Sequence, residues 1–283
     1  MFLLKKSISV GEIALALKLN CIGNSERLIN GVGSFNDATE NILCFANKIT
    51  ESNESKAIVI AKKNENGNVS YISSNPRLAF IQVLEWLELH IGFITDEAEA
   101  KVHETAIIGQ NVVLESGVTI GANTVIEHNV TIMKGTVIGE NCLIRGNVNI
   151  GGSGFGFERD ESGKSIKFIH LGRVLIGNSV EVGAGSCIAK GTMGNTVIED
   201  NVKIDNLVQV AHNSYLKSGS FILSGAAIGG SVVVGKNAWV GPNSVIYQKK
   251  NVGNNAIIGM GSVVLKNVKP LDTVFGNPSK SIK

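Results

Sequence analysis

One histidine in the sequence has the neighbours that a general base needs. His212 lies in the segment 204–213, IDNLVQVAHN, together with Asp205 and Gln209. An imidazole has an unperturbed pKa of about 6.5, and it exchanges protons near neutral pH when a carboxylate or an amide orients it. We expect Asp205 and Gln209 to orient His212 through neighbouring strands or turns. The simpler interpretation is an exposed histidine in a turn.

A glycine follows this histidine at a distance that matters in a repeat protein. Gly230 ends the segment 224–230, SGAAIGG, and it lies roughly eighteen residues, or one coil of three hexads, after His212. Its backbone N–H would then stack beside the imidazole and donate to an oxyanion, which is the arrangement that acyl transfer requires. Turn glycines are frequent in such folds, so this interpretation depends on His212.

The sequence lacks the other common catalytic patterns. His103, His128 and His170 are scattered along the chain, so we expect no bound metal. There is no GxSxG elbow, no GxxxxGK[ST] loop and no dinucleotide fingerprint, because no helix pattern follows the Gly-rich segment 151–156. We therefore expect no tightly bound cofactor.

The elements that would hold these residues follow a period of six. Aliphatic residues recur at every sixth position over 102–150, 176–188 and 198–264, and Gly or a small polar residue often follows, as in Ile120-Gly121-Ala122-Asn123. Gly and Asn adopt left-handed turn conformations at little cost. Each hexad forms a short strand and a turn, and three hexads close one triangular coil. The pattern predicts a mainly β fold, a left-handed parallel β-helix of about eight coils.

The repeat is interrupted twice, and both breaks are candidate walls of a site. The first is an insertion between Ile150 and Ile176 that begins GGSGFGF and continues with the charged run 158–167. The second consists of four extra residues around 191–196. A solenoid does not need such loops for stability, and loops often carry function.

Residues 1–98 lack the sixfold period and predict a small α/β domain, with the β-helix over 99–283. Ser9 is the expected cap of a helix over 12–18, and the segments 57–61 and 69–72 are expected strands. Asn75-Pro76 starts a helix pattern that ends at Gly92, and we expect its apolar stripe to belong to the domain core or to pack against the first coil, rather than to bind a ligand.

Composition narrows the class of protein. The chain has 283 residues and a net charge of +2, which does not indicate a nucleic-acid partner. The four cysteines form no CxxC pair, so neither a zinc site nor a disulfide scaffold is expected. The start of the chain lacks the pattern of a signal peptide, and no stretch approaches about 18 apolar residues. We expect a soluble cytoplasmic protein without a transmembrane segment.

Five segments resemble the UDP-3-O-acylglucosamine N-acyltransferases of lipid A biosynthesis, in the order of that family. They are DATENILCF at 37–45, NPRLAF at 75–80, GFGF at 154–157, LGRV at 171–174, and 204–213. The resemblance implies a homotrimer of left-handed β-helices with active sites between subunits. It also implies a cytoplasmic enzyme that acylates the amine of a nucleotide-activated amino sugar.

The resemblance implies roles for individual residues. His212 matches the family's catalytic base, and Asp205 and Gln209 match the residues around it. The expected substrate-binding residues are Phe45 and Asn47 at the nucleotide base, Phe155, Gly156 and Phe157 near the sugar and the acyl chain, and Asn206 and His170. His212 would deprotonate the sugar amine as it attacks a thioester, and the Gly230 N–H would stabilise the oxyanion. No covalent intermediate is needed, so the cysteines would be bystanders.

Three departures from the family bear on the donor and the sugar. First, the chain stops at Lys283 without the helical extension that helps the family recognise acyl carrier protein. Second, Ala189-Lys190-Gly191 stands where the family commonly has Asp-Arg-Gly. Third, no tyrosine follows Asn47 to complete the expected uracil pocket. The final residues resemble instead the coenzyme A-dependent sugar acetyltransferases, where this segment lies along the pantetheine and adenine. The donor-binding residues implied by that similarity are Gly259, Gly261, Asn277, Pro278 and Lys280.

We therefore predict an N-acyltransferase that moves a 3-hydroxyacyl group from acyl-CoA to the amine of a dTDP-linked amino-deoxyhexose, for O-antigen or another surface glycan. The alternative is a UDP-3-O-(3-hydroxyacyl)glucosamine N-acyltransferase of lipid A biosynthesis that uses acyl carrier protein. A non-catalytic solenoid scaffold and a sugar O-acetyltransferase are further alternatives; the latter demands more of the base because a hydroxyl is a poorer nucleophile.

Overall fold

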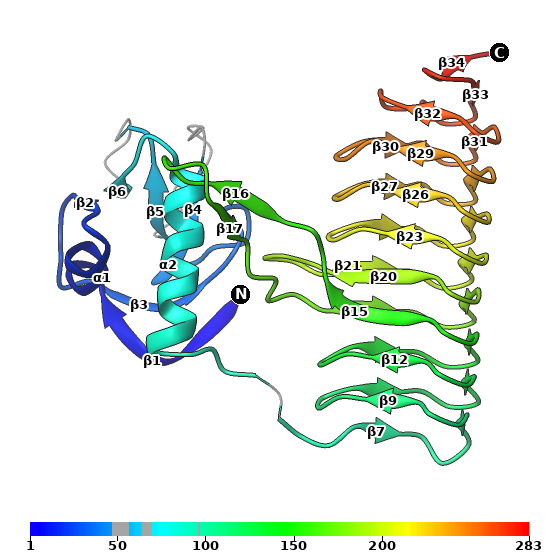
Figure 1. Cartoon of the computed structure of the whole chain (residues 1–283), viewed down its shortest axis with the longest axis horizontal. Coiled ribbons are helices and arrows are strands. Elements are labelled where there is room, and N and C mark those ends of the chain that lie inside the picture. Colours follow the sequence, from blue (N-terminus) through cyan, green and yellow to red (C-terminus); the bar gives the residue numbers. More distant parts are fainter. Residues whose placement is uncertain (47–56, 64–68, 96, 283) are drawn as a thin grey trace. The chain divides into compact units, whose positions relative to one another are not determined.

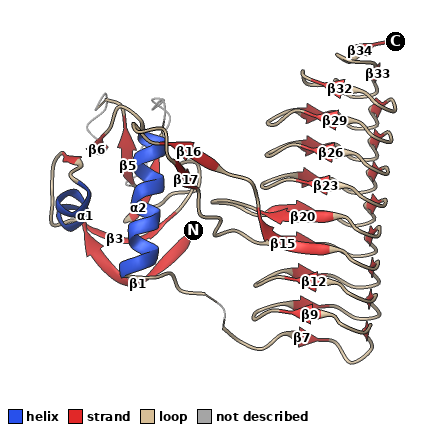
Figure 2. Ribbon diagram, in the orientation of Figure 1, coloured by secondary structure: helices blue, strands red, loops and turns tan. Residues whose placement is uncertain are grey.

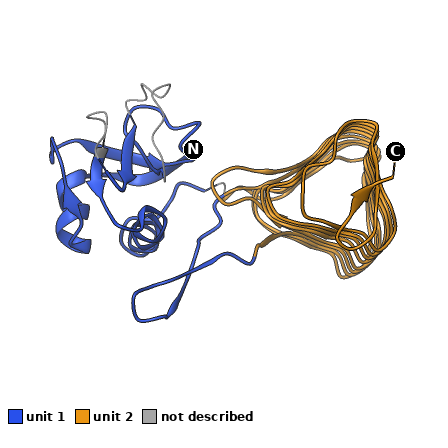
Figure 3. Cartoon of the chain, turned by 90° about the horizontal axis from the view of Figure 1, so that it is seen from above, with its two compact units in different colours: residues 1–95, 155–171 blue, residues 96–154, 172–283 orange. Residues whose placement is uncertain are grey.

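A computed structural model of the chain (Figure 1) describes residues 1–46, 57–63, 69–95 and 97–282. The chain divides into two compact units, shown in two colours in Figure 3. The first comprises Met1–Thr95 and Phe155–Leu171, and the second comprises Asp96–Gly154 and Gly172–Lys283. The insertion of the first break therefore belongs to the same unit as the N-terminal residues.

The first unit is a mixed sheet of six strands with two helices (Figure 2). Its strands are ordered β1-β3-β4-β5-β6-β2, and the insertion adds a separate two-stranded hairpin. The elements are β1 (Phe2–Ser9), α1 (Val10–Leu17), β2 (Asn20–Cys21), β3 (Leu28–Val32), β4 (Ile42–Phe45), β5 (Ile58–Ala61), β6 (Val69–Ile72), α2 (Pro76–His90), β16 (Phe157–Arg159) and β17 (Ser165–Lys167).

Both helices begin directly after their capping residues. Ser9 accepts a hydrogen bond from the N–H of Glu12, whose side chain bonds back to Ser9, so the capping box places the start of α1 at Val10, two residues before the expected start. Asn75 caps α2, and Pro76 occupies its first turn. The expected role of α2 in the core is confirmed by its buried side chains, Pro76, Ala79, Phe80, Ile81, Val83, Leu84 and Leu87.

The second unit is a left-handed parallel β-helix with a triangular cross-section (Figure 3). The first face consists of β7 (Lys101–Val102), β10 (Thr119–Ile120), β13 (Val137–Ile138), β18 (Val174–Ile176), β21 (Thr196–Ile198), β24 (Tyr215–Leu216), β27 (Val233–Val234) and β30 (Asn251–Val252). The second face consists of β8 (Ile107–Ile108), β11 (Val125–Ile126), β14 (Leu143–Ile144), β19 (Glu181–Val182), β22 (Lys203–Ile204), β25 (Phe221–Ile222), β28 (Trp239–Val240), β31 (Ile257–Ile258), β33 (Thr273–Phe275) and β34 (Lys280–Ser281). The third face consists of β9 (Val113–Leu114), β12 (Thr131–Ile132), β15 (Asn149–Ser153), β20 (Cys187–Lys190), β23 (Gln209–Val210), β26 (Ala227–Ile228), β29 (Val245–Ile246) and β32 (Val263–Val264).

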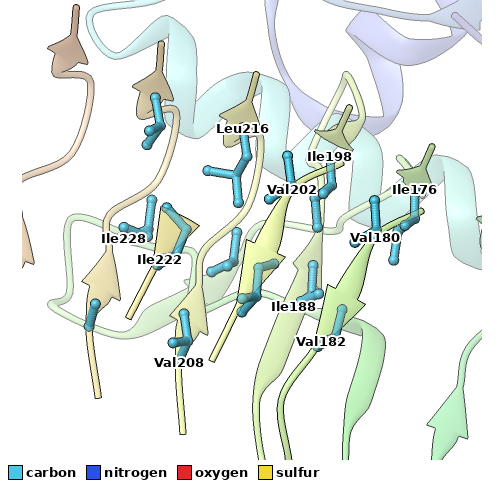
Figure 4. Packing of buried hydrophobic residues seen from close by; sticks show 14 of the residues in the cluster. Ile176, Val180, Val182, Ile188, Ile198, Val202, Val208, Leu216, Ile222 and Ile228 are labelled. Atoms are coloured by element: carbon cyan, nitrogen blue, oxygen red, sulfur yellow. The ribbon is translucent and has the colours of Figure 1, made fainter. Parts of the chain in front are cut away.

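The sixfold aliphatic residues form the core of the β-helix, as the period predicts. From Ile120 to Val264 each is at most 3% exposed, and neighbouring coils stack them in columns (Figure 4). Burying one such side chain contributes about 1.5–3 kcal/mol, so the repeat is stabilised coil by coil. Val102 and Ile108 are 39% and 37% exposed, because they belong to the first coil and have a stacking neighbour on one side only within the β-helix.

Gly and Asn both supply left-handed corner conformations, as expected and as at Gly117 with φ +68°, but a glycine directly after the core aliphatic has a different task. Asn123 has φ +56°, whereas Gly121 is not left-handed. A Cβ on Gly121 would lie 2.6 Å from the carbonyl of Gly139 in the next coil, so this glycine is required by the close stacking of coils. The asparagine provides the turn itself.

Neither α1 nor α2 is long and apolar enough to cross a membrane, and these are the helices of the described part of the chain.

Candidate active site

His212 lies at the corner of the β-helix that follows β23. The core residue Val210 is fully buried, and the chain turns outwards after it, so the imidazole is half-buried at the rim of the prism. The corner passes through Asn213, which has φ +59°, into β24. The sixfold pattern therefore places His212 at the corner after the strand and outside the aliphatic core.

The structure brings Gly230 against this histidine. Gly230 follows β26 at the same corner one coil further along, because β23 and β26 pair with Gln209 opposite Ala227. A Cβ on Gly230 would come 2.8 Å from both Nε2 and Cε1 of His212. The backbone of Gly230 and the reactive edge of the imidazole are thus neighbours, which is the relation that an oxyanion donor and a base require.

The contact that orients His212 comes from a residue that the sequence analysis did not select. Nδ1 of His212 lies 3.1 Å from Oδ1 of Asn213. Asp205 lies at another corner of the same coil, after β22, where its carboxylate accepts hydrogen bonds from the N–H groups of Asn206 and Ser224. The available signal for Asn213 was its position directly after the histidine.

Two further predicted residues of this region are exposed on the β-helix. The side chain of Gln209 points outwards from the third face, between Cys187 and Ala227 of the adjacent coils. Asn206 is exposed, and its Oδ1 accepts a hydrogen bond from the N–H of Ala184 at 2.7 Å. Their roles at a substrate stay predictions.

The expected donor-binding residues gather at the C-terminal coil. A Cβ on Gly259 would clash with the ring of Phe275, and Gly261 has φ +64°, so both positions require glycine. The N–H of Ser279 donates to the carbonyl of Val263, which holds the segment containing Asn277 and Pro278 against this coil. Lys280 is exposed at the start of β34.

In the first unit, an aromatic row connects Phe45 with the insertion. The ring centroids of Phe45 and Phe80 are 5.1 Å apart, those of Phe80 and Phe168 are 6.2 Å apart, and those of Phe168 and His170 are 6.3 Å apart. His170 is buried beside Gly156, on which a Cβ would come 3.2 Å from Cε1 of the imidazole. Three predicted substrate residues, Phe45, Gly156 and His170, thus share one unit. Asn47 lies outside the described residues.

The hairpin of the insertion presents two exposed aromatic rings. Phe155 is 92% exposed and Phe157 is 42% exposed, and their ring centroids are 4.9 Å apart. They line an open hollow of about 540 Å³ together with Glu158, Arg159 and Ser165. A salt bridge of 2.8 Å between Nε of Arg77 and Glu158 ties the hairpin to α2. The hollow is wide enough and apolar enough to receive part of an acyl chain.

Two of the four cysteines are buried thiols. All four cysteines are free, and burial raises the pKa of the Cys44 thiol to about 12 and also raises the pKa of Cys142. Such thiols are poor nucleophiles near neutral pH. Over the residues that the structure describes, no three His, Cys, Asp or Glu side chains are grouped to hold a metal ion.

Comparisons with known proteins concern the family and the fold of the chain. The family model for bacterial transferase hexapeptide (six repeats) matches residues 99–132 and 117–152. The chain is 35% identical over 237 residues to UDP-3-O-acylglucosamine N-acyltransferase of Coxiella burnetii. The matched region covers 72% of this chain and 69% of that protein. It is 42% identical over 140 residues to UDP-3-O-acylglucosamine N-acyltransferase 2 of Legionella pneumophila (strain Paris), where the match spans 50% of this chain and only 40% of the relative.

A solved structure has the same architecture. The UDP-N-acetylglucosamine acyltransferase of Francisella novicida superposes with a TM-score of 0.59 and 27% sequence identity, covering 65% of each chain. The similarity to this structure supports the β-helix fold.

Proposed function

Because the chain belongs to the UDP-3-O-acylglucosamine N-acyltransferase family, we propose that it transfers a 3-hydroxyacyl group from an acyl carrier protein thioester to the amine of UDP-3-O-acylglucosamine. The observation that carries the proposal is the imidazole of His212 against the backbone of Gly230. The names of the relatives favour this substrate over the dTDP-linked sugar and acyl-CoA that the sequence first suggested.

The proposed reaction uses one base and one oxyanion donor. Nε2 of His212 accepts a proton from the sugar amine as the nitrogen attacks the thioester carbonyl, so a C–N bond forms and the carbonyl oxygen becomes an oxyanion. The N–H of Gly230 donates to that oxyanion. The intermediate then collapses, the C–S bond breaks, and the imidazolium returns its proton to the leaving thiolate.

The two aromatic features of the first unit have separate roles in this proposal. Phe45 is half-buried at the end of β4 and offers a ring face to a nucleotide base. Phe155 and Phe157 offer an apolar hollow to the acyl chain. The product would be a diacylated amino sugar, made in the cytoplasm.

We further propose that three copies assemble. Phe221, Trp239 and Ile257 form an exposed apolar column on the second face, 40–44% exposed, as surfaces that bind another protein often do. An assembly in which the corner with Asp205 of one copy approaches His212 of another would unite the predicted site residues. Light scattering should give about 90 kDa for three chains of 29.9 kDa.

A donor and acceptor matrix tests the proposed activity. Thiol release and product mass are measured with 3-hydroxyacyl carrier protein or 3-hydroxyacyl-CoA against UDP-3-O-acylglucosamine or dTDP-linked amino-deoxyhexoses. We expect turnover with the carrier protein and the UDP sugar. Turnover only with acyl-CoA and a dTDP sugar would replace the proposal with surface-glycan acylation, and no turnover with either acceptor would leave the chain a scaffold.

A further inference from the structure

Asn213 has more partners than an ordinary corner asparagine. Its Oδ1 lies 3.1 Å from Nδ1 of His212 and also accepts two hydrogen bonds from Thr192, from the backbone N–H at 3.0 Å and from Oγ1 at 2.8 Å. The backbone of Asn213 is held as well, because its N–H donates to Oγ1 of Thr196 at 2.9 Å. Thr196 is itself anchored by a bond from Oγ1 to the carbonyl of Ala189 at 2.7 Å.

Thr192 determines which way the amide of Asn213 points. A backbone N–H can only donate, so the atom that faces it must be the amide oxygen and not the amide nitrogen. Asn213 therefore presents an acceptor to His212, and not a donor. The ring nitrogen that faces an acceptor must carry the proton, so Nδ1 of His212 is protonated.

This tautomer leaves Nε2 unprotonated, so Nε2 is the ring nitrogen that can accept a proton. Nε2 is the atom that lies against Gly230, where the proposed oxyanion donor is located. The opposite tautomer would place a proton on Nε2 and disable it as a base. The hydrogen bond on one side of the ring thus prepares the other side for proton transfer.

Both threonines belong to the second break of the repeat. Strand residues facing each other across this break are 22 positions apart, as Cys187 and Gln209 are, whereas Gln209 and Ala227 in the next pair of coils are 18 apart. The four additional residues place Thr192 above the corner of Asn213. In regular coils the Oδ1 of the corresponding asparagine accepts instead from an asparagine side chain 18 positions earlier, as Asn141 does from Asn123.

We propose that Asn213, fixed by Thr192 of the four-residue insertion, is a positioning residue that holds His212 in the Nδ1-protonated tautomer. The inference rests on the proposed function in that it assigns His212 the role of base. Asn213 touches neither substrate nor oxyanion in this proposal and acts through the imidazole alone.

A second asparagine serves as a matched control. Asn123 also occupies a left-handed corner, with φ +56°, and its N–H also donates to a threonine hydroxyl, Oγ1 of Thr105, at 2.9 Å. Its side chain donates to Asn141 of the next coil and to no catalytic group that we propose. Replacing either asparagine by glycine keeps the turn, because glycine tolerates positive φ.

Steady-state kinetics form the first test. We expect Asn213→Gly to lower kcat by about tenfold, the effect of one hydrogen bond, with the KM for the sugar within about twofold of the wild-type value. Asn123→Gly should leave both constants unchanged. Thr192→Val should lower kcat by a smaller factor of about three, and Thr192→Ser, which keeps the hydroxyl, should restore it. Equal effects of Asn213→Gly and Asn123→Gly would overturn the proposal.

The tautomer can be read without any turnover. Long-range ¹H–¹⁵N NMR of ¹⁵N-histidine protein distinguishes protonated from bare ring nitrogens, and His212→Gln assigns the signal. We expect Nδ1–H in the wild type and in Asn123→Gly, and a mixture of tautomers in Asn213→Gly. An Nε2–H wild type, or an unchanged tautomer in Asn213→Gly, would overturn the proposal. If the wild type shows the expected tautomer but turns over no substrate, the proposed function fails and the positioning of His212 stands.

Discussion

The imidazole of His212 lies against the Cα of Gly230 one coil further along the β-helix, so closely that a Cβ there would come 2.8 Å from Nε2. Gly230 does not have the positive φ that would require glycine for backbone reasons. Glycine is needed here because a side chain would collide with the imidazole of His212. Its absence also leaves the N–H of Gly230 beside the reacting centre.

We predict that Gly230→Ala lowers kcat by about 10²-fold, because the new methyl group displaces the imidazole from its place beside the oxyanion donor. The thermal midpoint should change little, since alanine suits the backbone. The comparison is Gly146→Ala, where a Cβ would meet its nearest atom at an ordinary 3.4 Å. A Gly230→Ala enzyme as active as Gly146→Ala would remove this contact from the mechanism.

Leu207 is a strained residue at a corner position that Gly or Asn usually occupies. It has φ +58° and is 71% exposed, while Gly185, Gly225 and Asn243 occupy the same corner in neighbouring coils with φ between +53° and +69°. Left-handed backbone costs a leucine roughly 1–2 kcal/mol, and strain of this kind is often retained for function. We predict that Leu207→Asn raises the free energy of unfolding by about 1 kcal/mol and lowers kcat/KM.

A second leucine separates the two effects of that substitution. Leu271 has φ +63° and is 65% exposed in the last turns of the β-helix. Leu271→Asn should stabilise the protein similarly, as judged by denaturant unfolding, and should leave kcat/KM unchanged. If Leu207→Asn stabilises the protein without any loss of activity, Leu207 has no part in the site.

Glu199 links stability to pH. The hydroxyl of Tyr215 and the N–H of Ser218 donate to its carboxylate and hold the pKa of Glu199 below its usual value of 4.5. A lowered pKa in the folded state stabilises the fold above the unfolded pKa, and this contribution disappears as the pH falls through the folded pKa. We therefore predict that Glu199→Gln and Tyr215→Phe lower the denaturation midpoint near pH 7.

The same variants should converge with the wild type once the pH falls below the pKa of Glu199 in the folded state, where the carboxylate is protonated in both states. Glu104→Gln, at an exposed position of the first coil, should have no effect at either pH. A difference between Glu199→Gln and the wild type that is as large at low pH as at pH 7 would contradict the assignment.

Phe45 tests the nucleotide site of the first unit. We predict that Phe45→Ala raises the KM for the UDP sugar by about tenfold or more at nearly unchanged kcat, because stacking on a base contributes about 1–3 kcal/mol. Phe45→Tyr keeps the ring face and should keep the KM within about threefold. Circular dichroism should confirm that the ring packed beside Phe80 is not needed for folding. An unchanged KM in a folded Phe45→Ala would place the base elsewhere.

Sequence periodicity predicted the β-helix because each hexad forms the same local structure, which consists of a short strand with an inward-facing aliphatic residue and a corner. It also located His212 and Gly230, since residues 18 positions apart stack in adjacent coils. The capping pattern of Ser9 and Glu12 predicted a short helix for an equally local reason.

Contacts that cross the breaks could not be predicted in this way. Thr192 reaches Asn213 over 21 positions, a separation outside the period of 18, and nothing local indicates which donor the insertion presents. Phe168 packs beside Phe80 although 88 residues separate them. The sequence of an insertion does not indicate which distant apolar surface it will pack against. Leu207 did have a signal, because leucine stands at a corner position that Gly or Asn usually occupies.

The central claim is that His212 is the general base of acyl transfer to an amino sugar. The most direct test compares the kcat of His212→Ala with that of the wild type, using UDP-3-O-acylglucosamine and a 3-hydroxyacyl carrier protein as substrates. Calorimetry measures the binding of the sugar to both proteins. We predict that binding is retained and that kcat falls by about 10²–10⁴-fold, the usual contribution of a positioned base. A His212→Ala enzyme that binds the sugar and keeps the wild-type kcat would contradict the account.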